Sequence, residues 1–166
     1  MQYTKDYDLP GFLLAIDFQK AFDSLEWDFI FKSLQLFNFG PSLQKWVKVF
    51  YNNPTSCVMN RGLGSGYFNI NRGVRQGDPV SPALFIIALE LLLVSILHDD
   101  SISGINIENT ETKYSASADD LTCFLSEYNS GVNLLSTLEK FSVYSGLNVN
   151  YDKTEAIWLG VEVSYG

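Results

Sequence analysis

Apolar residues follow two different spacings along the chain, which predicts a fold of mixed strands and helices. The continuous apolar run of residues 11–16 has the length of a strand that is buried on both faces. Apolar residues then recur at helical spacing in residues 27–37 and again in residues 43–50, with Gly40 and Pro41 between the two patterns. We therefore predict a strand followed by two helices that cover its sheet.

The second half of the chain predicts a hairpin and then an alternation of helix and strand. Residues 55–60 and 67–71 flank a flexible glycine-rich loop, which has no phosphate-loop signature. Pro82 suits the first turn of an apolar helix at residues 83–97. The remaining predicted elements are strands at residues 105–107, 113–118, 121–125 and 156–159 and a helix at residues 132–144. This pattern predicts one α+β domain over residues 1–166.

Two adjacent carboxylates, Asp119 and Asp120, stand between two of these strands, where a tight turn is expected. Asp17 ends the first strand and should lie at the same edge of the sheet. Neighbouring carboxylates repel one another, so a fold that gathers them usually supplies a cation, most often Mg²⁺. A solvated turn is the alternative for Asp119 and Asp120, because Asp is a common turn residue. The third carboxylate favours the metal site.

Four segments resemble, in order and spacing, the palm motifs of LINE-type reverse transcriptases, the polymerases of retrotransposons without long terminal repeats. They are FLLAIDFQKAFD at residues 12–23, RGVRQGDPVSP at 72–82, ADD at 118–120 and SGLNVNYDKT at 145–154. The resemblance covers nearly the whole chain. It implies a polymerase palm, with helices packed on an antiparallel sheet of ferredoxin-like type. It also implies RNA-directed DNA synthesis from a primer.

The resemblance assigns catalytic and metal-binding roles to individual residues. Asp17 and Asp119 would bridge two divalent ions, Mg²⁺ or in its place Mn²⁺, with help from Asp120. The backbone carbonyl of Phe18 would face the same ions beside the nucleotide. Two ions about 3.5–4 Å apart stabilise the attacking and leaving oxygens of an in-line displacement. Lys153 matches a late lysine that protonates or neutralises the leaving pyrophosphate; a lysine at a strand edge is the alternative.

The incoming nucleotide would meet residues of two motifs. Phe22 matches an aromatic ring that excludes a ribose 2′-hydroxyl, with a core phenylalanine as the alternative. Gln76 and Gly77 would lie beside the nucleotide and the template, because a glycine allows close approach. Arg75 would contact a phosphate or remain solvated. For Asp23, which follows Phe22, capping of the next helix is the preferred role.

The net charge of −8 stands against a nucleic-acid partner, because proteins that grip a phosphate backbone usually carry a basic patch. In such polymerases the basic surfaces lie largely on the fingers and thumb, and we expect the thumb and the amino-terminal fingers to be missing from residues 1–166. The resemblance implies an RNA template, a DNA primer, deoxynucleoside triphosphates and those missing segments as partners. No membrane is expected, because the apolar run at residues 83–97 contains Glu90 and is shorter than the ~20 residues that span a bilayer.

Two cysteines and the start of the chain bear on its compartment. Cys57 and Cys123 are too few and too far apart for a zinc site or a disulfide framework, so both are predicted to be buried, reduced thiols. Polar residues follow Met1 without the apolar run of a signal peptide. We expect an intracellular protein, in the nucleus if it derives from a eukaryotic retrotransposon.

Two functions are open at this point. Ser117 stands where the family has an aromatic residue before the Ala-Asp-Asp motif, which removes a contact beneath the primer end. The first function is a metal-dependent RNA-directed DNA polymerase palm that works when joined to its missing parts. The second is a catalytically silent remnant of a retrotransposon polymerase that acts as an interaction module. The fragment alone is expected to be inactive, and a nucleotide cyclase on a similar palm has no recognisable motif here.

Overall fold

The computed structural model describes residues 11–159, so the terminal residues used for the signal-peptide prediction lie outside the described range. Its main sheet consists of β1 (Gly11–Ile16), β8 (Tyr114–Ser117), β9 (Asp120–Leu125) and β10 (Glu155–Leu159). The strands lie in the order β10-β1-β9-β8, and each neighbouring pair is antiparallel. With helices between β1 and β8 and between β9 and β10, this is the ferredoxin-like arrangement that was predicted.

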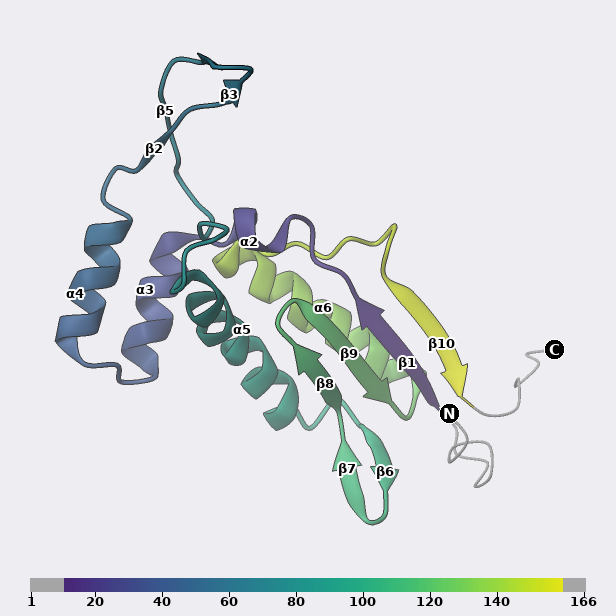
Figure 1. The fold of residues 1–166 in the computed structure, drawn as a ribbon. Coiled ribbons are helices and arrows are strands. Elements are labelled where there is room, and N and C mark those ends of the chain that lie inside the picture. Colours follow the sequence, from purple (N-terminus) through teal and green to yellow (C-terminus); the bar gives the residue numbers. More distant parts are fainter. Residues whose placement is uncertain (1–10, 160–166) are drawn as a thin grey trace.

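Two long helices form a layer behind this sheet (Figure 1). They are α5 (Ser81–His98) and α6 (Tyr128–Ser145), which contact each other, and α6 also contacts β9. By length and composition alone α5 could cross a membrane. Eight of its side chains are nevertheless buried inside the protein, which confirms the predicted core helix.

The first strand is buried on one face only, so the prediction of burial on both faces is wrong. Phe12, Leu14 and Ile16 are buried, whereas Leu13 and Ala15 between them are half-buried. The same alternation continues in β9, where the buried side chains are Leu121, Cys123 and Leu125. Successive side chains of a strand point to opposite faces. One face of the sheet therefore carries the core, and within residues 11–159 the other face has no helix over it.

The two helices predicted at residues 27–37 and 43–50 are present, but they do not cover the sheet as predicted. They are α3 (Trp27–Leu36), which packs against α5 and α6, and α4 (Pro41–Phe50), which packs against α3. Only Val47 of α4 is buried, and Trp46 is 61% exposed. Helix packs on helix here, so α3 and α4 extend the helical layer sideways (Figure 1).

The predicted helix cap at Asp23 is also wrong. A short helix, α2 (Ala21–Ser24), contains Asp23 and precedes α3. The residue that caps α3 is Glu26, and it makes no side-chain capping hydrogen bond. Because α2 and α3 are separate helices, Asp23 lies too early in the chain to reach the first turn of α3.

A two-part hairpin joins α4 to α5 and projects from the body (Figure 1). Its base pairs β2 (Thr55–Ser56) with β5 (Phe68–Asn69), and its outer part pairs β3 (Met59–Asn60) with β4 (Leu63–Gly64). We call residues 55–71 the arm. The glycine-rich segment predicted as a loop thus contains a strand. Cys57, in the arm, is half-buried, so its predicted burial is wrong, whereas Cys123 is buried.

A second hairpin lies at the opposite end of the molecule from the arm (Figure 1). It pairs β6 (Ile105–Ile107) with β7 (Thr110–Thr112) as a small separate sheet. Lys113, directly after it, is buried and donates from Nζ to the carbonyls of Leu97 and Asp99 at 3.1 and 2.9 Å. These two bonds satisfy carbonyl groups at the carboxyl end of α5 and favour its dipole.

Candidate active site

The end of β1 and the β8–β9 turn lie together at one end of the sheet (Figure 1). In the β1–β9 ladder, Ile16 pairs with Leu121. Asp17 follows Ile16 and Asp120 precedes Leu121, so one further step of the same register sets the two aspartates opposite each other. The strand end and the acidic turn are therefore neighbours, and the catalytic roles of their aspartates stay predictions.

The β8–β9 turn has two residues. Ser117 pairs with Asp120, which leaves Ala118 and Asp119 between the strands. Ala118 has a φ of 54°, a left-handed conformation that costs a non-glycine residue on the order of 1 kcal/mol. The structure thus separates the two acids, because Asp119 lies in the turn and Asp120 begins β9.

The acids lie on the uncovered face of the sheet. Ile16 and Leu121 are buried on the helical face. Because neighbouring side chains of a strand point to opposite faces, Asp17 and Asp120 point away from the helices. Asp17 is half-buried, whereas Asp119 and Asp120 are exposed. A large substrate can therefore approach Asp17 and Asp120 from the uncovered face, and Asp119 is exposed in the turn beside them.

Asn150 holds Asp17 from the segment that follows α6, residues 146–150, which we call the strap. The side-chain Nδ2 of Asn150 donates a hydrogen bond to Asp17 Oδ2 at 2.8 Å, and its backbone N–H donates to the Asp17 carbonyl at 2.7 Å. The Asp17 N–H donates to Thr154 Oγ1 at 3.3 Å. Within residues 11–159 no hydrogen bond reaches Asp17 Oδ1. One carboxylate oxygen is thus held in place while the other stays open.

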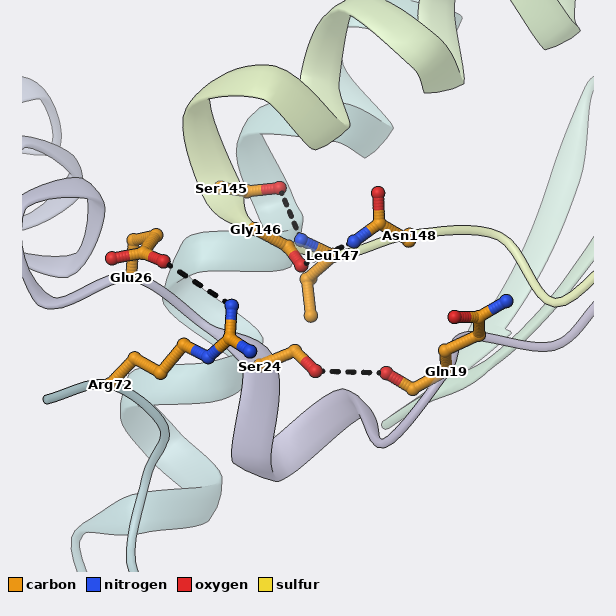
Figure 2. A network of polar contacts seen from close by, with 8 residues as sticks. All are labelled: Gln19, Ser24, Glu26, Arg72, Ser145, Gly146, Leu147 and Asn148. Carbon is orange, nitrogen blue, oxygen red and sulfur yellow. Dashed lines mark hydrogen bonds and ion pairs between the residues drawn. The ribbon is translucent and has the colours of Figure 1, made fainter. Parts of the chain in front are cut away.

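Figure 2 shows how the strap is fixed beside α2 and the start of α3. Gly146 ends α6 with a φ of 78°, and a Cβ at this position would lie 2.4 Å from the Ser24 carbonyl oxygen. The Leu147 N–H donates to Ser145 Oγ at 3.1 Å, and the Glu26 N–H donates to the Ser145 carbonyl at 2.8 Å. Only a glycine permits this close crossing. The crossing in turn sets where the strap meets β1.

Beyond Asp17 the chain keeps its pairing with the strap. Phe18 and Val149 form an isolated bridge, flanked by hydrogen bonds that use the Asp17 carbonyl and the Gln19 N–H. Carbonyl groups alternate in direction along an extended backbone. The Phe18 carbonyl therefore points away from the strap, toward the β9 side, where the predicted ions would lie.

Phe22 lies in α2 with one ring face against the core. Its ring stacks on Phe85, with a centroid distance of 4.6 Å and an interplanar angle of 17°. Its carbonyl accepts a hydrogen bond from the Val74 N–H at 2.6 Å, which ties α2 to the loop before α5. Phe85 is fully buried and Phe22 is half-buried. The ring thus contacts the core and keeps accessible surface, as a gate would require.

Three of the predicted nucleotide-binding residues lie in that loop, residues 72–80. Arg75 is exposed and donates from Nη2 to the Phe50 carbonyl at 3.1 Å. Gln76 is exposed. Gly77 has a φ of 88°, and no atom lies within 4 Å of the place where a Cβ would stand. The loop therefore leaves open space around Gln76 and Gly77.

A buried hydroxyl pair lies beneath this loop. Burial raises the pKa of Tyr51, and the nearby Ser81 hydroxyl opposes part of that rise. Ser81 Oγ is buried and makes no hydrogen bond of good geometry within the described residues. The two hydroxyls are thus close enough to influence each other without being aligned. Asp78 adds to the rise by its charge and also accepts a hydrogen bond from the Val80 N–H at 3.0 Å.

Lys153 lies in the turn between the strap and β10. It is exposed, and its backbone N–H donates to the Asn150 carbonyl at 3.1 Å. The strand begins only at Glu155, so Lys153 occupies a turn and not a strand edge. Lys153 lies between Asn150 and Thr154, which both bond Asp17, so it is at the same end of the sheet.

The oxygen donors at this end suit a hard divalent cation such as Mg²⁺ or Mn²⁺. They are the free oxygen of Asp17, the carboxylates of Asp119 and Asp120, and the Phe18 carbonyl. Among residues 11–159, no three His, Cys, Asp or Glu side chains are grouped closely enough to hold a metal by themselves. Backbone and substrate oxygens would therefore have to complete the coordination.

Asn150 and Thr154 were not predicted as site residues, although both lie in the last motif. Leu147 and Val149 are buried, whereas Asn148 and Asn150, which alternate with them, are not. This period of two was visible in the sequence and places both amides on the side away from the core. The alternation predicts which way the Asn150 side chain points. It does not predict the bond to Asp17, because Asp17 is more than a hundred residues away in the chain.

Comparisons with known proteins identify the family and the fold of this chain. A family model described as reverse transcriptase (RNA-dependent DNA polymerase) matches residues 5–163. The retrovirus-related Pol polyprotein from the type-2 retrotransposable element R2DM of Drosophila melanogaster is 33% identical over 144 residues, which is 86% of this chain and 13% of the relative. The corresponding polyprotein from the type-1 element R2 of Popillia japonica is 30% identical over 148 residues, which is 87% of this chain and 20% of the relative.

Solved structures show the same fold in a telomerase. Apo telomerase from Candida tropicalis matches 97% of this chain and 30% of its own, with a TM-score of 0.70 at 14% identity. This chain therefore spans less than a third of each of these proteins. The family match over nearly all residues, the similarity to R2 polyproteins and the palm-like sheet lead to one conclusion: the chain belongs to the reverse transcriptase family, and its sequence is of the LINE type.

Proposed function

We propose that this chain is the palm of an RNA-directed DNA polymerase that adds deoxynucleotides to a primer with two divalent metal ions. The observation that carries the proposal is the meeting of Asp17 and the Asp119-Asp120 turn at one end of the sheet, on its uncovered face. Asn150 supports the proposal. Its side chain donates to the Asp17 carboxylate at 2.8 Å and its backbone N–H donates to the Asp17 carbonyl at 2.7 Å, so Asp17 is positioned before substrate arrives. Preorganised charge is the main requirement of phosphoryl transfer.

Each residue has a defined task in this proposal. Asp17 and Asp119 hold the ions, with the Phe18 carbonyl beside them. When bound, the ions stabilise the charge on the attacking and leaving oxygens. Phe22 excludes a ribose 2′-hydroxyl by contact, supported from behind by Phe85. Lys153 carries a proton or a positive charge to the leaving pyrophosphate.

The nucleotide and template would lie over the loop before α5. Gln76 and Gly77 border open space there, so a base pair can approach the backbone closely. RNA as template is supported by the family description and by a structural neighbour, the telomerase of Candida albicans, which was solved with a fragment of telomeric RNA. Activity requires the fingers and thumb that hold the triphosphate and duplex, because this chain covers only a small part of its relatives.

A catalytically silent remnant is the second candidate function, and Ser117 favours it. Ser117 ends β8, is exposed, and pairs with Asp120 beside the acidic turn. A small side chain at this place offers little surface to a primer end. An intact Asp17, Asp119 and Asn150 would not be needed in a remnant, which favours the polymerase.

Primer extension on an RNA template tests the proposal. The polymerase that contains this palm joined to fingers and thumb should extend a DNA primer with Mg²⁺ or Mn²⁺. Asp17→Ala and Asp119→Ala should reduce extension by several orders of magnitude, whereas the exposed Asp100→Ala, at the far end of α5, should not. The 166-residue chain alone should give no extension. Equal activity of the Asp119→Ala and Asp100→Ala variants would refute the polymerase.

A further inference from the structure

The positive charge of this acidic chain is concentrated in one continuous segment. Residues 29–77 contain six of the eleven lysines and arginines and none of the nineteen acids. The six are Lys32, Lys45, Lys48, Arg61, Arg72 and Arg75. The whole chain has a net charge of −8, yet it contains a basic segment that includes most of α3, all of α4 and the arm. Two acids border this segment, Asp28 in α3 and Asp78 in the loop after the arm.

This basic segment forms one side of the molecule. Figure 1 shows α3, α4 and the arm beside one another, away from β1, β9 and β10. Lys45 and Lys48 are exposed on α4 and line an open hollow of about 520 Å³ together with Gln44 and Asn52. Arg61 is exposed at the turn between β3 and β4. A strand of phosphates that follows this side would meet positive charge along its length.

The arm also exposes aromatic and apolar side chains that the core does not use. Tyr67 is 79% exposed and Phe68 is 49% exposed. No residue from 55 to 72 is buried, so these rings do not hold the arm to the body. A two-stranded ribbon without packing is marginally stable in water. Exposed rings on such a ribbon provide stacking surfaces for bases.

We propose that α4 and the arm form a binding surface for single-stranded nucleic acid, outside the aspartate site. Lys45, Lys48 and Arg61 contact phosphates, and Tyr67 stacks on a base. The charge decides between this occupant and a protein, because residues 41–71 carry Lys45, Lys48 and Arg61 and no acid, and such a surface is complementary to a polyanion. The contacts are to phosphates and base faces, so RNA and DNA of the same length should bind alike.

The surface extends the proposed function, because it leads a strand toward the end of the sheet that carries the acids. In Figure 1 the arm leaves the body at the end where β1 stops and the β8–β9 turn lies. Two arginines follow the arm in the loop before α5. Arg72 forms an ion pair with Glu26 at 3.9 Å (Figure 2), whereas Arg75 is exposed and adds positive charge beside the arm. Binding here requires no catalysis, so it can be measured without polymerase activity.

Fluorescence anisotropy tests the inference on the 166-residue chain with Asp119→Ala, which removes catalysis. The probe is a labelled single strand of mixed sequence, about 20 nucleotides long, as RNA and as DNA. The parent should bind, and its affinity should fall with salt concentration. Lys45→Glu with Lys48→Glu should weaken binding about tenfold or more and lower the salt slope by roughly 1.4. Tyr67→Ala should weaken it by about tenfold with an unchanged slope.

Matched controls lie on α6, outside the basic segment. Lys140→Glu and Tyr144→Ala alter an exposed lysine and an exposed tyrosine and should change affinity less than twofold. Far-ultraviolet circular dichroism confirms that each variant is folded. The inference is overturned if the parent does not bind the probe at low salt, or if Lys140→Glu weakens binding as much as the α4 pair. It is also overturned if Trp46→Ala disrupts self-association of the chain while probe binding stays independent of salt, which would assign α4 to a second copy.

Discussion

Asn150 and Asp17 are joined by two hydrogen bonds, one from the side-chain amide to the carboxylate and one from backbone to backbone. The pair connects the last palm motif to the first across 133 residues of chain. The backbone bond holds the two residues next to each other, which keeps the Asn150 amide within reach of the Asp17 carboxylate. Asp17 is therefore positioned by the strap, and the strap by the end of α6.

Replacing Asn150 should impair catalysis without unfolding the protein. Asn150→Ala removes a hydrogen bond to a charged group, an interaction of about 1.5–3 kcal/mol, so primer extension by the complete polymerase should fall roughly 10- to 100-fold. The control is Asn148→Ala, whose amide donates to the Gly146 carbonyl at 3.2 Å and does not contact Asp17. Steady-state kinetics with increasing Mg²⁺ measures the effect. Equal losses in the two variants would show that Asn150 does not act through Asp17.

Gly146 should be among the least replaceable glycines of the chain. In Gly146→Ala the new Cβ would have to stand 2.4 Å from the Ser24 carbonyl oxygen, at a φ of 78°. Strain at such a position costs about 1–3 kcal/mol, and the clash with backbone adds to it. Gly66→Ala is the control, since no atom lies within 4 Å of its Cβ position. Urea unfolding followed by circular dichroism should show a clear loss only for Gly146→Ala, and equal midpoints would contradict the account.

Phe22 should set the choice between ribose and deoxyribose. Phe22→Ala in the complete polymerase should raise ribonucleotide incorporation relative to deoxynucleotide incorporation by at least about tenfold, because the ring that meets the 2′-hydroxyl is gone. Phe29→Ala removes another half-buried ring, which packs edge-on against Phe141, and should leave the ratio unchanged. Competition assays with both nucleotides give the ratio. The same ratio in all three enzymes would place Phe22 in the core alone.

The two thiols should react very differently. Burial raises the pKa of Cys123 from 9.0 to about 12, so its thiolate is scarce below that pH. In a Cys57→Ser chain, iodoacetamide at pH 8.5 should label Cys123 only after denaturant is added, whereas Cys57 of a Cys123→Ser chain should react in the folded state. The folded thiol binds its proton more tightly than the unfolded one. Its contribution to stability is therefore complete below pH 9 and is lost as the pH rises toward about 12. Labelling of both chains at one rate would contradict the burial of Cys123.

Local patterns predicted the strands and helices that make the palm, and motif order predicted their assembly. The apolar run at residues 121–125 and the proline at the start of α5 each identify one element from a few residues. The outer location of α4 could not be predicted, because its apolar stripe of Leu43, Trp46 and Phe50 has the spacing of a core helix. A stripe shows that a face is apolar, and only the fold shows what covers it.

The sequence predicted only part of the candidate site, because local patterns do not show which distant residues come into contact. Asp17, Asp119 and Asp120 were recognised because each lies at the end of a strand pattern. Asn150 was overlooked because its role depends on a distant partner, and no local pattern encodes a hydrogen bond between residues 17 and 150. The basic character of residues 29–77 was hidden by the net charge of the whole chain.

Manganese broadening of amide NMR signals tests most directly whether the end of β1 and the β8–β9 turn form one metal site. Mn²⁺ broadens the signals of nearby amides even when it binds weakly. On titration into the 166-residue chain, the signals of Asp17 and Phe18 should broaden together with those of Asp119 and Asp120, and excess Mg²⁺ should restore all four. Asp119→Ala should abolish the effect at both segments. Broadening that begins at Asp99 and Asp100 while Asp17 and Asp119 stay sharp would contradict the account.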